Sequence, residues 1–151
     1  MTLQTARAIM LRNLLRAGDR KRTARLLDKL HPADLSRLIP ELQELELGRA
    51  AAVLFDDVRV NKSVAGLSGG AVEELIAAAQ DADAARALAY LGPRHAAQLM
   101  VAMSDDRRLS ILGRLGQPVR GDIIASLPRS ARPKTDDLDV SAAFRLRRMF
   151  A

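Results

Sequence analysis

Residues 66–70 read GLSGG and match the G-x-S-x-G pattern of a nucleophile elbow, in which a reactive serine sits on a sharp turn between a strand and a helix. That chemistry also needs an acid and a histidine further along an α/β sheet. His95 is the only downstream histidine, and the flanking sequence shows no alternation of strands and helices. Ser68 is better explained as the cap of a helix start. We therefore expect no enzyme.

The residue types that hold transition metals are scarce. The chain has no cysteine, so a disulfide framework, a thiolate nucleophile and a cysteine-ligated zinc are excluded. Its two histidines, His31 and His95, stand beside prolines that begin helices, and no H-E-x-x-H pair is present. We read both histidines as helix-start residues.

The chain is basic, with a net charge of +6 and a sequence pI near 10.7. Such a charge permits an acidic protein partner, an anionic membrane surface or nucleic acid. Aromatic residues make up only 3% of the chain, which disfavours nucleic acid because base stacking needs them. Two groups of cations are candidate partner-binding residues: Arg20, Lys21, Arg22 and Arg25, and then Arg145, Arg147 and Arg148.

Each of these two groups has two interpretations. The first group is either an ordinary solvated helix face or a docking patch for acidic or phosphate groups. The second lies on a C-terminal amphipathic helix. That helix either folds back to close the end of the domain or meets a partner or an anionic membrane.

The first half of the chain predicts four helices. The first covers residues 3–17 and ends at Gly18; the second covers residues 19–30, with Asp19 as its cap. The third begins at Pro32, and the fourth runs from Glu44 or Gly48 to Val58. Residues 59–66 are expected to be a connection, formed by a short extended segment or by one irregular helical turn. The expected core-facing stripes are Leu3, Ala6, Ile9, Met10, Asn13 and Leu14 on the first helix and Leu35, Leu38 and Leu42 on the third.

The second half is periodic. Capping residues or prolines recur every 12 or 13 residues, at Ser68, Asp81, Pro93, Asp105 and Pro118. A helix of about ten residues is marginal alone in water and must bury its apolar stripe against neighbours. This pattern predicts an all-α fold, a right-handed superhelix (solenoid) of about nine or ten short helices, similar to armadillo proteins.

The composition changes after Leu127. We expect the superhelical domain over residues 1–128, a basic linker over residues 129–138 and a C-terminal basic amphipathic helix over residues 139–151. The N-terminus lacks the apolar region of a secretory signal, and the longest apolar run, residues 50–55, is far below the roughly 18 residues that span a bilayer. We expect a cytoplasmic protein without a transmembrane segment.

One stretch carries a family resemblance. Residues 14–42, with LRAGD at 15–19 and LLDKLHPADL at 26–35, resemble the cytosolic N-terminal domain of the MgtE magnesium transporters. The resemblance implies a non-enzymatic regulatory or protein-interaction module whose partner is a membrane transporter at the inner face of the membrane. The FliG proteins of the flagellar switch use similar short-helix superhelices, so a scaffold in a motor complex is the alternative.

The resemblance also implies a link to magnesium, an ion that prefers carboxylate and water ligands. Asp105 and Asp106 match an acidic pair that opens a helix in that family, and they are the candidate ligands. The acid that the family carries after an Ala-Ala pair falls here on Gln98 or Ala52, neither of which is acidic.

Overall fold

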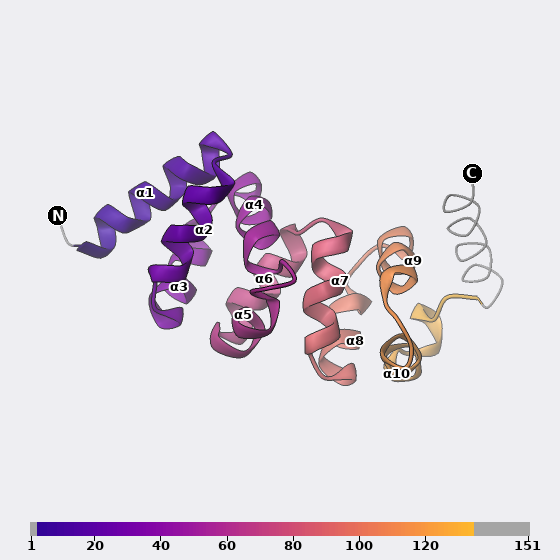
Figure 1. Cartoon of the computed structure of the whole chain (residues 1–151). Helices are drawn as coiled ribbons and strands as arrows, with labels where there is room; N and C mark the ends of the chain where they lie inside the picture. The colour runs from indigo at the N-terminus through magenta and orange to yellow at the C-terminus, as the bar shows by residue number, and fades with distance from the viewer. Residues whose placement is uncertain (1–2, 135–151) are drawn as a thin grey trace, which may run out of the picture. The chain divides into compact units, whose positions relative to one another are not determined.

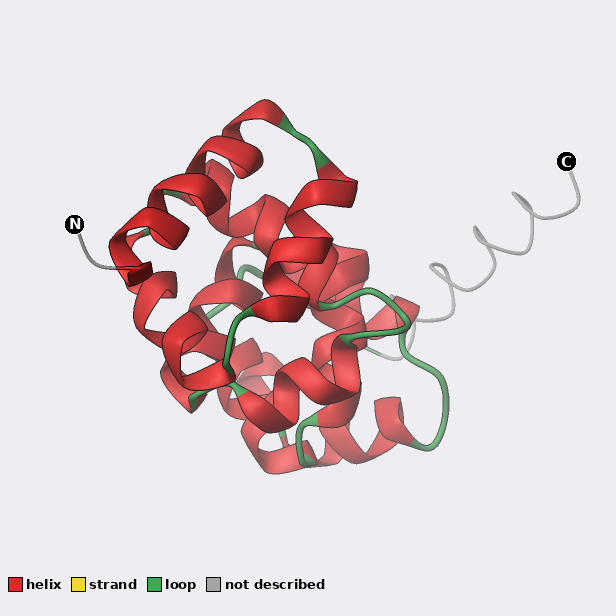
Figure 2. Ribbon diagram, turned by 60° about the vertical axis from the view of Figure 1, so that its left-hand side comes forward, coloured by secondary structure: helices red, strands yellow, loops and turns green. Residues whose placement is uncertain are grey.

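A computed structural model describes residues 3–134, with side chains from Thr5 onward. Within that range the chain forms ten α-helices and two 3-10 helices and has no strand, which confirms the all-α prediction (Figure 2). The chain divides into two compact units, Met1–Tyr90 and Leu91–Ala151. The predicted C-terminal helix over residues 139–151 lies outside the described residues.

The helices are short and follow one another through brief turns (Figure 1). The first unit contains α1 (Leu3–Ala17), α2 (Arg20–Lys29), α3 (Pro32–Leu38), the 3-10 helix η1 (Ile39–Glu41), α4 (Glu44–Leu54), α5 (Val60–Gly66), α6 (Gly69–Ala78) and α7 (Asp81–Tyr90). The second unit contains α8 (Pro93–Val101), α9 (Asp105–Arg114), α10 (Val119–Ser126) and the 3-10 helix η2 (Arg129–Ala131).

Most predicted helix starts are confirmed, because the cause of each is local. The Ser68 hydroxyl accepts a hydrogen bond from the Ala71 N–H at 3.2 Å and caps α6. The Asp19 carboxylate caps α2 in the same way, and Gly18 turns the chain between α1 and α2 with a left-handed φ of 71°. Helices α7, α8 and α9 begin at the expected Asp81, Pro93 and Asp105, and Pro118 is the N-cap of α10.

The expected apolar stripe of the third helix was wrong in one position. Leu35 and Leu42 are buried, but Ile39 is fully buried in place of Leu38, which is half-buried. Helix α3 ends at Leu38 and tightens into η1, which contains Pro40. A proline inside an α-helix removes a backbone hydrogen bond and clashes with the preceding turn, so the α-helix stops before it.

Residues 59–66, expected to be a connection, instead contain the helix α5. The Asp56 carboxylate accepts hydrogen bonds from the N–H groups of Val58 and Arg59, at 3.0 and 2.7 Å, in the turn that precedes this helix. Val60 and Ser63 are buried. The alternation of apolar and polar residues did not indicate a helix, because the buried residues of α5 are just Val60 and Ser63.

The expected apolar face of α1 was also wrong. Ile9 and Met10 are about half exposed, whereas Leu11 and Leu15 are buried where α1 contacts α2 and α4. Helix α1 is apolar on two sides, so its periodicity alone did not identify the side that faces the core.

The core is built from aliphatic side chains and alanine, with Phe55 as its one fully buried aromatic residue among the described positions. Small residues allow close helix packing. A Cβ placed on Gly48 of α4 would lie 3.1 Å from the Ala78 carbonyl oxygen at the end of α6. The absence of a side chain at Gly48 therefore permits the close approach of α4 and α6.

Side-chain hydrogen bonds in the first unit recur at a nearly constant sequence separation. Each of the following pairs joins residues 31 to 34 positions apart: Arg12 with Glu46, Arg49 with Leu15, Arg20 with Ala52, Arg59 with Asp28, Ser68 with Ser36, and Arg86 with Phe55. These bonds connect α1 and α2 to α4, α2 to the start of α5, α3 to the start of α6, and the end of α4 to α7.

The most buried of these bonds holds a charge. The Glu46 side chain is only 1% exposed and contacts the guanidinium groups of Arg12 at 3.2 Å and Arg16 at 3.3 Å. Its carboxylate also accepts the Gln43 N–H at 2.9 Å. Burial opposes ionisation, but the Gln43 hydrogen bond and the arginines outweigh it and lower the pKa of Glu46. Glu46 therefore joins α1 to α4 as an anion.

Glu46→Gln should lower the free energy of unfolding by about 1–3 kcal/mol at neutral pH, because the variant loses charge-assisted hydrogen bonds in a buried place. The Glu46 contribution is complete above the ordinary pKa of 4.5 and is lost as the pH falls through the lowered folded value. Urea unfolding across acidic pH should therefore show a flatter pH dependence for this variant. Glu44→Gln, at an exposed position of the same helix, is the control and should change little.

Candidate interaction surfaces

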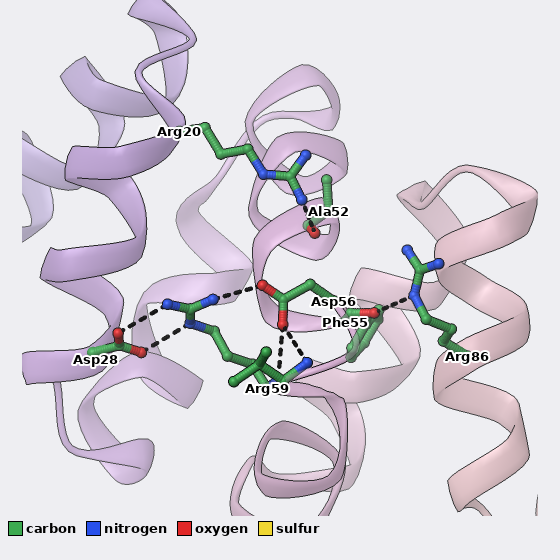
Figure 3. A network of polar contacts seen from close by, with 8 residues as sticks. Arg20, Asp28, Ala52, Phe55, Asp56, Arg59 and Arg86 are labelled. Atoms are coloured by element: carbon green, nitrogen blue, oxygen red, sulfur yellow. Dashed lines mark hydrogen bonds and ion pairs between the residues drawn. The ribbon is translucent and has the colours of Figure 1, made fainter.

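The four predicted cations of α2 do not act together. The Arg20 guanidinium donates to the Ala52 carbonyl oxygen of α4 at 3.3 Å (Figure 3). Arg22 forms an exposed ion pair with Asp19 at 3.6 Å. Lys21 and Arg25 are exposed, and neither has an ion pair among the described residues. The structure thus divides the predicted patch between two sides of the helix.

Lys21 and Arg25 belong to a stripe that includes one residue missed at the sequence level. Lys29 follows at the same spacing, and the i, i+4, i+8 pattern places all three on one face of α2. Lys29 is also exposed and has no ion pair within the described range. We call Lys21, Arg25 and Lys29 the α2 cation stripe. The fourfold spacing was the signal that could have added Lys29.

Many of the other arginines have a structural role at the C-terminal ends of helices. Such ends carry free carbonyl groups and a partial negative charge. Five arginines donate to these carbonyls: Arg49 to Leu15 and Arg16, Arg20 to Ala52, Arg86 to Phe55, Arg108 to Met100 and Met103, and Arg132 to Ala125 and Leu127. Much of the positive charge is therefore used within the fold.

Arg59 forms a polar network with two carboxylates (Figure 3). Its guanidinium donates to both oxygens of Asp28 on α2, at 3.0 and 3.1 Å, and to the Asp56 carboxylate at 2.6 Å. The hydrogen bonds from Arg59 lower the pKa of Asp28 below its usual value, and those to Asp28 raise the pKa of Arg59. The network links α2, the turn after α4 and the start of α5.

The magnesium candidates lie in the second unit. Asp105 forms an ion pair with Arg108, and its own side chain is 93% exposed; Asp106 is exposed as well. A hollow beside them is also lined by Arg108, Arg132 and Lys134. Three cationic side chains thus surround two carboxylates, an arrangement that opposes a divalent cation. No group of three or more His, Cys, Asp or Glu side chains within residues 3–134 is placed to hold a metal.

The remaining sequence candidates have local roles or fall outside the described range. The His31 Nδ1 accepts the Ala33 N–H at 3.1 Å and caps α3. Ser68 also donates its backbone N–H to the Ser36 hydroxyl at 2.9 Å, which ties α6 to α3. Arg145, Arg147 and Arg148 lie outside the described residues. Of the expected linker, residues 129–131 form η2.

Comparisons of the chain with protein-family models, with curated proteins and with solved structures find no match. The described helices include none with the length and apolar character needed to cross a membrane.

Arg59→Lys should reduce the free energy of unfolding by about 1–2 kcal/mol, because lysine keeps the charge but cannot bind Asp28 with two parallel hydrogen bonds. The pKa of Asp28 should rise toward its ordinary value for the same reason, and an NMR titration of the carboxyl carbons measures this change directly. Arg94→Lys, at an exposed position of α8, is the control for a simple exchange of arginine for lysine. An unchanged Asp28 pKa in Arg59→Lys would contradict the role given to Arg59.

Magnesium titration should give only weak, non-saturating amide shifts at Asp105 and Asp106, because Arg108 already neutralises one carboxylate. Calcium chloride and sodium chloride serve as controls for general ionic effects. Saturable shifts confined to these two residues and their neighbours under magnesium alone would show a site and contradict the prediction.

Proposed function

We propose that this chain is a non-enzymatic protein-interaction or regulatory module that presents the α2 cation stripe to an acidic region of a partner protein. The observation that carries the proposal is the stripe itself: three exposed cations on one helix face with no ion pair among the described residues. The one acid within α2, Asp28, is held by Arg59. The charge of the stripe is thus available to a partner.

The spacing of the stripe supports this role. Like charges four residues apart on a helix repel each other and cost about 0.2–0.5 kcal/mol per pair. The repulsion within the stripe therefore opposes the stability of α2, and of the three cations only Lys29, in the last turn, gains from the helix dipole. An acidic partner would relieve this repulsion, and complementary charge would mainly raise the rate of association.

We propose further that the helices form a right-handed superhelix, similar to the N domain of the MgtE transporters. Hydrogen bonds at a separation of 31 to 34 residues support this, because in a solenoid each repeat contacts its neighbours at a fixed interval. The likeness of residues 14–42 to that domain favours a transporter at the inner face of the membrane as partner. In this proposal, regulation linked to magnesium runs through the partner. A FliG-like scaffold in a motor complex shares the same short-helix pattern.

The test uses a short glutamate-rich peptide as the probe. Calorimetric titration should show binding that weakens as salt rises, because exposed charges are screened. The double variant Lys21→Glu with Arg25→Glu should bind at least about tenfold more weakly, which corresponds to about 1.4 kcal/mol. The fold should survive, since the carboxylate introduced at position 25 would pair with Lys29 four residues later.

The matched control is Arg94→Glu with Arg129→Glu, which changes the net charge equally at two exposed cations of the second unit. This control should retain binding. Equal losses in both double variants would show that only net charge matters and would overturn the proposal. Stronger binding of a single-stranded oligonucleotide or of anionic vesicles than of the peptide would replace the protein partner with nucleic acid or membrane.

A further inference from the structure

A hollow in the first unit lies between α4 and the turn that joins α1 to α2. Its volume is about 290 Å³. It is lined by neutral or cationic residues alone: Leu14, Leu15, Gly18, Arg20, Thr23, Arg49, Ala52 and Val53. Two guanidinium groups thus line a space in which no carboxylate takes part.

Both arginines donate to backbone carbonyl groups, which carry no formal charge. Arg49 donates through one Nη to the Leu15 and Arg16 carbonyl oxygens, at 2.7 and 2.9 Å. Arg20 donates through one Nη to Ala52, as Figure 3 shows. A guanidinium has five N–H donors, so each arginine keeps donors for another acceptor.

The acids nearest in sequence are committed elsewhere. Asp19 accepts the Arg22 N–H at 3.1 Å and pairs with the Arg22 side chain. Glu46 is held by Arg12, Arg16 and the Gln43 N–H. The formal charge of Arg20 and Arg49 is therefore not balanced by an acid of α1, α2 or α4 within the described residues.

Apart from Gly18 and the buried Thr23, the remaining wall of the hollow is aliphatic. Leu15 and Val53 are buried, and Leu14 and Ala52 are half-buried. An anion that fits such a site carries an aliphatic group next to its charge. Pockets for small molecules usually measure about 300–1,000 Å³, so this hollow holds one residue-sized group rather than a nucleotide or a large cofactor.

The geometry points to a site for the C-terminal residue of a partner chain, with its carboxylate on Arg20 and Arg49 and its aliphatic side chain against Leu14, Ala52 and Val53. A C-terminal residue is the protein group that joins a carboxylate and an aliphatic side chain at one carbon, and planar guanidinium groups bind carboxylates through paired hydrogen bonds. This site is independent of the α2 cation stripe, because Arg20 lies on the side of α2 turned toward α4.

The experiment is an NMR titration of the whole chain with three acetylated peptides that differ only at the end. One ends in leucine with a free carboxylate, one ends in leucine amide, and one ends in serine with a free carboxylate. The free leucine peptide should give saturable shifts centred on Gly18, Arg20 and Ala52. Amidation should weaken binding at least about tenfold by removing the charge. Serine should weaken it about tenfold by removing apolar contact.

Two variants test the position of the site. Ala52→Leu fills the hollow and leaves both arginines in place, so it should abolish binding. Arg20→Gln removes one charge at an exposed position whose one described hydrogen bond is at 3.3 Å, so the fold should persist, as circular dichroism and thermal unfolding can show, while binding weakens. Arg49 is left intact because it caps α1.

The stripe variant, Lys21→Glu with Arg25→Glu, should bind the free leucine peptide as the unmodified chain does. Loss of binding in that variant would place the carboxylate on the stripe and overturn the inference. Equal affinity for the acid and the amide, or for leucine and serine, would overturn it as well. Displacement of the peptide by dodecanoate at lower concentration than the peptide itself requires would assign the hollow to a lipid anion instead.

Discussion

The fold depends on satisfying the carbonyl groups at the ends of short helices. Each α-helix leaves four carbonyls without an intrahelical partner, and in helices of 7 to 15 residues these ends make up a large part of the backbone. Arginine meets this need well, because one guanidinium can donate to two carbonyls at once and its charge suits the negative end of the helix dipole. Arg49 does so at α1 and Arg108 at α8. This role agrees with the composition of the chain, in which 20 of the 24 cations are arginine.

The net charge of +6 therefore does not describe one basic surface. Some cations cap helix ends, some neutralise buried or half-buried acids such as Glu46 and Asp56, and a third set faces solvent without a described partner. Among the described residues, the third set is free to bind another molecule, as are guanidinium groups that donate only to carbonyls, such as those of Arg20 and Arg49. The charges available for binding are therefore those that the fold does not use, and the net charge of the chain does not identify them.

Sequence reasoning succeeded where the cause of a feature is local. Ser68, Asp19 and Pro32 specify helix starts within one turn of the chain, so α6, α2 and α3 were predictable. It failed for α5, because no side chain caps the start of that helix. It also failed for the buried face of α1, because apolar residues lie on two sides of that helix and burial is decided by its neighbours. For the candidate surface, the basic cluster of the sequence included Lys21 and Arg25 but did not separate them from Arg20, because that separation depends on Ala52, 32 residues away from Arg20. The pairing of Arg20 with Arg49 around one hollow could not be read from the sequence, because it follows from the packing of α1, α2 and α4.

The recurring separation of 31 to 34 residues links these observations. The same interval joins a buried ion pair at Arg12 and Glu46, an exposed one at Arg59 and Asp28, and a neutral bond between Ser68 and Ser36. Because these pairs differ in chemistry and share only their spacing, the spacing follows from the path of the backbone rather than from any one type of residue. Two hollows of the first unit lie beside bonds of this kind, one at Arg59 and Asp28 and the other at Arg20 and Ala52. The two hollows differ in the charges that line them. The hollow at Arg59 and Lys62 contains the Asp28 carboxylate, whereas the hollow at Arg20 and Arg49 has no carboxylate to balance its cations.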